Sequence, residues 1–183
     1  MAAIVSVAKK EQWAQKINAG VAAVISNRPA AEGLVAAARL GVATAVIDHR
    51  QYETRGAFDT ALQRSIDAYQ PALVVLAGFM RILTPAFVAH YKGRLVNIHP
   101  SLLPAFTGLN THQRAIDAGC HVAGATVHQV TADLDHGPIL AQVAVPVLQG
   151  DTAATLAARV LTQEHRVYPQ AIRSLLASMP DVD

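Results

Sequence analysis

Short apolar runs that alternate with helical patterns restrict the fold of this 183-residue chain more than any other feature. Pro29–Leu40 is rich in alanine and stops at Gly41, Asp59–Tyr69 places Leu62, Ile66 and Tyr69 on one helical face, and Thr84–Tyr91 has Pro85 in its first turn. Strands that alternate with helices build a mostly parallel sheet with helices on both faces. We therefore predict an α/β, doubly wound, Rossmann-like domain, with strands at 21–25, 42–47, 72–77, 95–98, 123–130 and 139–147.

The last third follows a different plan. A loop with two aspartates, Asp133 and Asp135, separates the runs 123–130 and 139–147, so these two runs are expected to pair antiparallel. Asp151 is predicted to cap a final helix that runs through Val160 and beyond.

Composition narrows the class of protein. An apolar content of 52% excludes disorder, and a net charge of +2 with scattered basic residues gives no reason to expect nucleic acid. The single Cys120 permits no internal disulfide, so a cytoplasmic location is expected. No apolar run is long enough to span a membrane, and residues 1–183 are expected to form one domain.

The run 95–98 ends in the polar residues most relevant to chemistry. Asn97 and His99 are two apart on an extended chain, so their side chains leave on the same side. Strand ends at the carboxyl edge of an α/β sheet are where ligands bind. An amide donor and an imidazole at one point suit the charge that develops on a carbonyl oxygen during acyl transfer. On spacing alone, the pair could equally serve only to satisfy the backbone of the next loop.

Four motifs occur in order along the chain: Ala77–Leu83 (AGFMRIL), Asn97–Pro104 (NIHPSLLP), Leu134–Pro138 (LDHGP) and Thr162–His165 (TQEH). With them the chain resembles the 10-formyltetrahydrofolate-dependent formyltransferase family, and most of all its members that act on phosphoribosylglycinamide. The likeness extends from about Ile25 to Pro169.

The resemblance implies an enzyme that moves a formyl group from 10-formyltetrahydrofolate to the amine of 5-phosphoribosylglycinamide in purine biosynthesis. It implies three catalytic residues. His99, as imidazolium, stabilises the oxyanion and assists proton transfer, and Asn97 donates a second hydrogen bond. Asp135 supports His99 and the movement of protons, and its place before His136-Gly137-Pro138 selects it over Asp133.

The resemblance also implies binding residues. On the folate side they are Arg55, Met80, Arg81, Ile82, Leu83 and Val130, with the two arginines facing the glutamate tail. On the side of the other substrate they are Asn97, Pro100 and Glu164, of which Glu164 matches a residue that contacts the ribose hydroxyls. No metal is expected, because the histidines at 99, 112, 128 and 136 lack metal-ligand spacing.

The beginning of the sequence departs from the family pattern. The first glycine is Gly20, and Met1–Ala19 is predicted to be mainly an amphipathic helix. In the resembled family, a strand and a phosphate-gripping loop precede that helix, so the chain is expected to be N-terminally truncated relative to the family. The expected consequence is a gap in the sheet, recruitment of Met1–Val7 as a strand, or a neighbouring chain in the vacant place.

Three alternatives stay open at this point. A formyltetrahydrofolate hydrolase of the same superfamily would carry an extra N-terminal domain, and a formyltransferase acting on initiator tRNA would carry an extra C-terminal domain. An inactive folate-binding fragment would result if the phosphate loop is lost. The expected partners are small molecules, without nucleic acid or membrane, and the assembly could be a homodimer.

Overall fold

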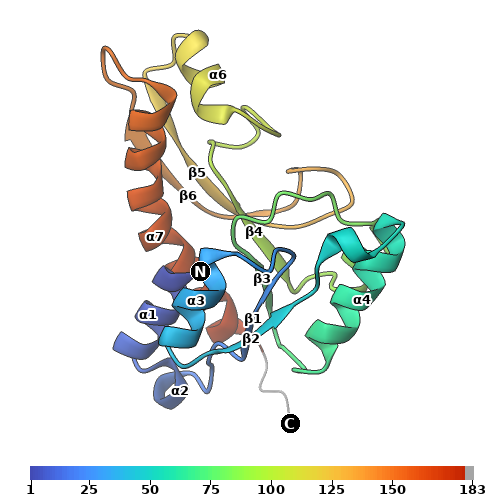
Figure 1. Cartoon of the computed structure of the whole chain (residues 1–183). Coiled ribbons are helices and arrows are strands. Elements are labelled where there is room, and N and C mark those ends of the chain that lie inside the picture. Colours follow the sequence, from blue (N-terminus) through green and yellow to red (C-terminus); the bar gives the residue numbers. More distant parts are fainter. Residues whose placement is uncertain (180–183) are drawn as a thin grey trace.

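Two sheets run through residues 1–179, which the computed structural model describes (Figure 1). In the smaller sheet, β1 (Ala23–Ser26) and β2 (Ala43–Val46) pair in parallel. The larger sheet has the order β3 (Val74–Leu76), β4 (Leu95–His99), β5 (Val122–Gln129) and β6 (Ile139–Pro146). The pair β3–β4 is parallel, whereas β4–β5 and β5–β6 are antiparallel.

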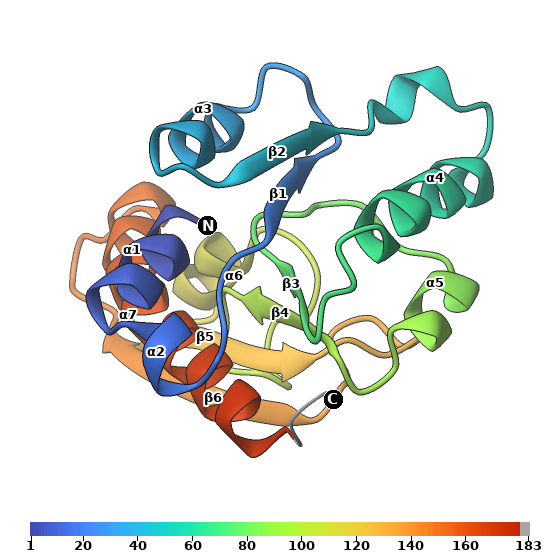
Figure 2. The same cartoon turned by 90° about the horizontal axis from the view of Figure 1, so that it is seen from below.

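The predicted gap in the sheet is present. Among the described residues, no hydrogen-bonded pairing joins β1 or β2 to β3, and Figure 2 shows the small sheet standing apart from β3. Val24 and Ile25 are only half-buried, although a central strand of a parallel sheet is normally covered on both faces. The alternative in which Met1–Val7 forms a strand is wrong, because Ala2–Lys10 is the helix α1.

Helices cover both faces of the larger sheet, as the doubly wound prediction requires. Successive residues of β4 point to opposite faces. Val96 packs in one core with residues of α1 and of α7 (Ala153–Ser178), including Ile4 and Tyr168. Leu95 packs in another core with residues of α4 (Arg55–Asp67) and α5 (Pro85–His90).

Three other helices lie before β3: α2 (Trp13–Lys16), α3 (Glu32–Arg39) and the 3-10 helix η1 (His49–Gln51). The predicted single helix over Met1–Ala19 is broken, because Gln12 takes a left-handed conformation with φ +58° and separates α1 from α2. The predicted end of α3 is confirmed, since Gly41 follows its C-cap at φ +70°.

Two capping residues set helix starts that differ from the predicted ones. Thr54 accepts a hydrogen bond from the Ala57 amide, so α4 begins four residues before the predicted Asp59. Asp151 is not the cap of α7, because Thr152 takes that role with Thr155 in a capping box. The Asp151 carboxylate is engaged instead by Arg159, 2.6 Å away.

The chain after β4 contains the predicted antiparallel pair and one helix that was not predicted, α6 (Thr111–Asp117). The antiparallel pairing of β4 with β5 was also not predicted. No helix within residues 1–179 is long and apolar enough to cross a membrane.

Candidate active site

β4 brings Asn97 and His99 to its carboxyl end, as predicted. The Cα of Asn97 is paired with that of His128 on β5, so the polar side chains of two neighbouring strands lie opposite one another. His99 and His128 are buried at 6% and 2% exposure. This is the only place along β4 where polar residues replace its apolar sequence.

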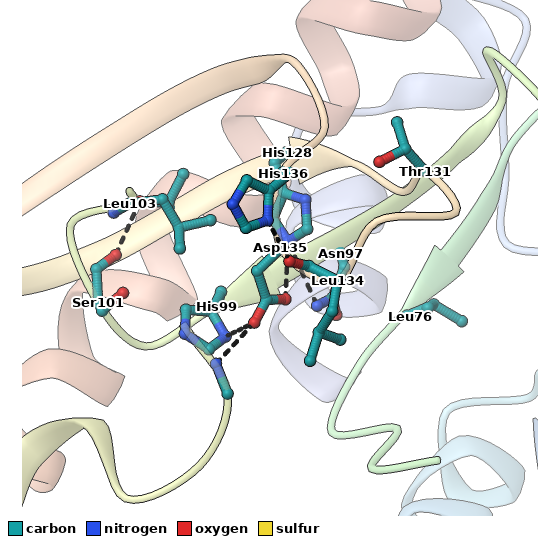
Figure 3. A network of polar contacts seen from close by, with 12 residues as sticks. Leu76, Asn97, His99, Ser101, Leu103, His128, Thr131, Leu134, Asp135 and His136 are labelled. Carbon is teal, nitrogen blue, oxygen red and sulfur yellow. Dashed lines mark hydrogen bonds and ion pairs between the residues drawn. The ribbon is translucent and has the colours of Figure 1, made fainter. Parts of the chain in front are cut away.

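Asp135 completes the group from a loop that follows β5. Its backbone takes a left-handed conformation at φ +57°, and its side chain is only 7% exposed. Asp135 Oδ2 lies 3.5 Å from His99 Nδ1, and Oδ1 lies 3.8 Å from His128 Nε2 (Figure 3). The structure therefore brings the three predicted catalytic residues together, with Asp135 between two histidines.

Both ring nitrogens of His99 face acceptors. His99 Nε2 lies 3.0 Å from the carbonyl oxygen of Phe106, and Nδ1 faces the Asp135 carboxylate. A carbonyl oxygen and a carboxylate oxygen both accept hydrogen bonds, so each ring nitrogen of His99 lies beside an acceptor.

His128 is a member of the group that the sequence did not single out. Burial lowers the pKa of His128, although the Gln129 carbonyl and Asp135 act in the opposite direction, so the ring is held neutral. Its Nδ1 donates to the Gln129 carbonyl at 2.9 Å, which leaves Nε2 to accept from Asn97 Nδ2 at 3.5 Å. This contact orients the Asn97 amide. The available signal was a histidine near the end of a mostly apolar strand.

The loop between β4 and α6 closes over the same carboxylate. The Gly108 amide donates to Asp135 Oδ2 at 2.9 Å, and two residues earlier the Phe106 carbonyl meets His99. Phe106 lies in the left-handed region at φ +54°. These contacts were also missed, because nothing in the residue types of this loop indicates where its backbone points.

A buried hydroxyl fixes the turn that follows His99. Thr126 on β5 is fully buried, donates to the Ser101 carbonyl at 2.7 Å and accepts from the Leu103 amide at 3.0 Å. Gln142 on β6 donates to the same hydroxyl at 2.9 Å and lies 3.0 Å from the Leu103 carbonyl. Thr126 thereby ties the chain after His99 to the larger sheet.

The residues expected on the folate side divide into an exposed and a buried set. Met80 and Ile82 are 77% and 61% exposed, which leaves two apolar side chains open on the loop after β3. Arg81 is exposed and stacks over the Phe58 ring, with Cζ 5.3 Å from its centroid. Arg55 is exposed at the first residue of α4.

Leu83 and Val130 belong to the packed interior. Leu83 is 9% exposed in the same core as Phe58, and Val130 is partly buried against that core. Their side chains support the exposed loop from beneath rather than presenting an open surface.

Pro100 and Glu164 lie on different elements. Pro100 is half-buried directly after β4, next to His99. Glu164 is half-buried on α7, where burial raises the pKa of its carboxyl, opposed by the charge of the Met1 amine. Within residues 1–179, no group of three or more His, Cys, Asp or Glu side chains is placed to hold a metal ion.

Comparison with known proteins decides the family. A family model described as formyl transferase matches residues 1–172. The chain belongs to the formyl transferase family. Phosphoribosylglycinamide formyltransferase of Escherichia coli is 51% identical over 157 residues, which cover 86% of this chain and 74% of that protein. The human trifunctional purine biosynthetic protein adenosine-3 is 48% identical over 155 residues, which cover 85% of this chain and 15% of that protein.

A solved formyl transferase also shares the fold along the whole chain. The crystal structure of phosphoribosylglycinamide formyltransferase from Brucella melitensis superposes with a TM-score of 0.89 at 48% identity. It covers all of this chain, and this chain covers 92% of it. The predicted fold class is therefore confirmed.

Proposed function

We propose that this formyl transferase moves a formyl group from 10-formyltetrahydrofolate to the amine of 5-phosphoribosylglycinamide, a step of purine biosynthesis. The observation that carries the proposal is the buried group of His99, Asn97 and Asp135 at the carboxyl end of β4. Relatives named phosphoribosylglycinamide formyltransferase, at 51% and 48% identity, support the choice of substrate.

In the proposed reaction, the substrate amine attacks the formyl carbon and negative charge develops on the formyl oxygen. The Asn97 amide and the His99 ring are the proposed donors for that charge, in a site that water reaches poorly because the His99 and Asp135 side chains are under 10% exposed. Asp135 offsets the positive charge of His99 and, through a water molecule, can take a proton from the attacking amine.

The folate is proposed to lie along the loop after β3. Met80 and Ile82 provide exposed apolar surface for an aromatic ring system, and such side chains in water-facing loops often mark ligand sites. Arg81 and Arg55 provide cations for the carboxylates of the glutamate tail. Leu83 and Val130 hold this wall in place from the core.

The other substrate is proposed to lie on the opposite side of His99. Pro100 and Asn97 border this side, and Glu164 offers a carboxylate to hydroxyl groups of the ribose.

The test is a transfer assay with the purified chain, 10-formyltetrahydrofolate and phosphoribosylglycinamide, read by mass spectrometry of the formylated amine. Formation of that product supports the proposal. Formate with no formylated amine would indicate the hydrolase alternative. Calorimetric binding of a non-reactive folate analogue without any turnover would indicate a folate-binding fragment.

Two further expectations accompany the proposed reaction. The cytoplasm is the proposed compartment, as the lone Cys120 suggested. A homodimer is the proposed assembly, which sedimentation of the purified chain would detect.

A further inference from the structure

We propose that Arg114 is a positioning residue of the active site, which holds the Gly108 amide on the Asp135 carboxylate by fixing the peptide between Thr107 and Gly108. Arg114 projects from α6, and its Nη1 donates to the carbonyls of Thr107 at 2.5 Å and Leu109 at 3.3 Å. Neither of these contacts involves a predicted catalytic residue.

The planarity of the peptide connects Arg114 to the site. The Thr107 carbonyl and the Gly108 N–H belong to one trans peptide unit, in which the two groups point in opposite directions. Arg114 holds the carbonyl end, and the N–H end donates to Asp135 Oδ2 at 2.9 Å. A rotation of this peptide about the chain would break both hydrogen bonds together.

The charge of the guanidinium adds to this geometry. A cation on a carbonyl oxygen polarises the peptide and strengthens its N–H as a donor. Gly108 has φ +76°, a conformation that a residue with a side chain rarely adopts, so the peptide direction needs both the glycine and an external anchor.

The same anchor holds the neighbouring contact with His99. The Arg114 guanidinium lies 5.4 Å from the centroid of the Phe106 ring, and the Phe106 carbonyl accepts from His99 Nε2 at 3.0 Å. Arg114 therefore contacts three of the four residues from 106 to 109, and two of those four touch the catalytic pair. If Arg114 only covered the loop carbonyls, its removal would leave the Gly108–Asp135 and Phe106–His99 hydrogen bonds unchanged.

The neighbouring Gln113 provides a matched control. It is also exposed on α6, and its Nε2 donates to Asp117 Oδ1 at 2.8 Å on the same helix, away from the loop. Arg114→Gln removes the fork of donors and the charge, Arg114→Lys keeps the charge with a single nitrogen, and Gln113→Ala disturbs α6 without touching the loop.

The deciding measurement is amide hydrogen exchange at Gly108, followed by NMR of the full chain. We expect exchange on the order of tenfold faster in Arg114→Gln, an intermediate rate in Arg114→Lys and an unchanged rate in Gln113→Ala. Unchanged exchange at Gly108 in Arg114→Gln would overturn the proposal, and so would equal acceleration in Gln113→Ala. If Arg114→Gln does not fold, the comparison of Arg114→Lys with Gln113→Ala decides by the same criterion.

The kinetic consequence rests on the proposed function. For Arg114→Gln we expect kcat about tenfold lower, the KM for folate within twofold of the wild-type value, and partial recovery in Arg114→Lys. A change in KM alone would contradict a positioning role. If the wild-type chain transfers no formyl group, the proposed function fails, while the exchange rates still decide the role of Arg114.

Discussion

Thr126→Val tests whether the larger sheet holds the turn that follows His99. The substitution keeps the shape of a fully buried side chain and removes its hydroxyl. The Leu103 amide then loses its acceptor, and the Ser101 carbonyl loses its donor. Gln142 keeps its contact with the Leu103 carbonyl, so two buried groups are left without partners.

Each buried polar group left without a partner costs about 1–3 kcal/mol, so the free energy of unfolding should fall by roughly 2–6 kcal/mol. For a chain of this size, that corresponds to a Tm lower by roughly 10 °C. Thr126→Ser is the matched control, because it keeps the hydroxyl and loses one methyl group, which costs about 1 kcal/mol.

Urea unfolding of the three proteins gives the comparison. The midpoint should decrease from wild type to Thr126→Ser to Thr126→Val, with a constant slope of free energy against urea. Equal midpoints for the two variants would refute the reasoning, because the loss would then follow side-chain volume and not the hydrogen bonds of the hydroxyl.

Two other predictions concern pH and folate. Burial lowers the folded-state pKa values of His128 and His112, so the unfolded chain binds more protons than the folded chain, and stability should fall as the pH drops below about 6.5. Urea unfolding at pH 7.5 and 5.5 should show a smaller loss of stability in His128→Gln than in wild type. An equal loss in the two proteins would contradict this prediction. Arg55→Ala and Arg81→Ala should each raise the KM for folate by about fivefold and leave kcat unchanged. Arg39→Ala on α3 is the control, and equal KM values in all three variants would show that Arg55 and Arg81 do not bind folate.

Local patterns were sufficient to predict much of the fold. The apolar runs located every strand, and Gly41 and Pro85 marked a helix end and a helix start as they do in other proteins. The observed helix starts at Arg55 and Ala153 differ from the predicted ones. The start depends on which of several nearby hydroxyls or carboxylates accepts a hydrogen bond from the backbone at the cap. The side chain of Asp151 was available for the α7 cap, but Arg159 engages it.

Some residues of the candidate site were predicted from the sequence and others were missed. The alternation at a strand end placed Asn97 and His99 on one side, but their catalytic roles, like that of Asp135, came from the family resemblance. His128 and the Gly108 amide were missed, because they reach Asp135 only through the register of β5 on β4 and the path of a loop. Such long-range contacts leave no local signal in residue type or spacing.

A double-mutant cycle across His99 and Asp135 tests the central claim most directly, namely that these two side chains act as one unit in formyl transfer. The rate of transfer, as kcat/KM, is measured for wild type, His99→Ala, Asp135→Ala and the double variant, with circular dichroism to confirm folding. Each single variant should lose on the order of a hundredfold or more. The double variant should be about as slow as the slower single variant. The two side chains are 3.5 Å apart and act as one unit, so removing the second after the first should cost little more. Losses that multiply, or a folded His99→Ala protein with near-normal transfer, would contradict the account.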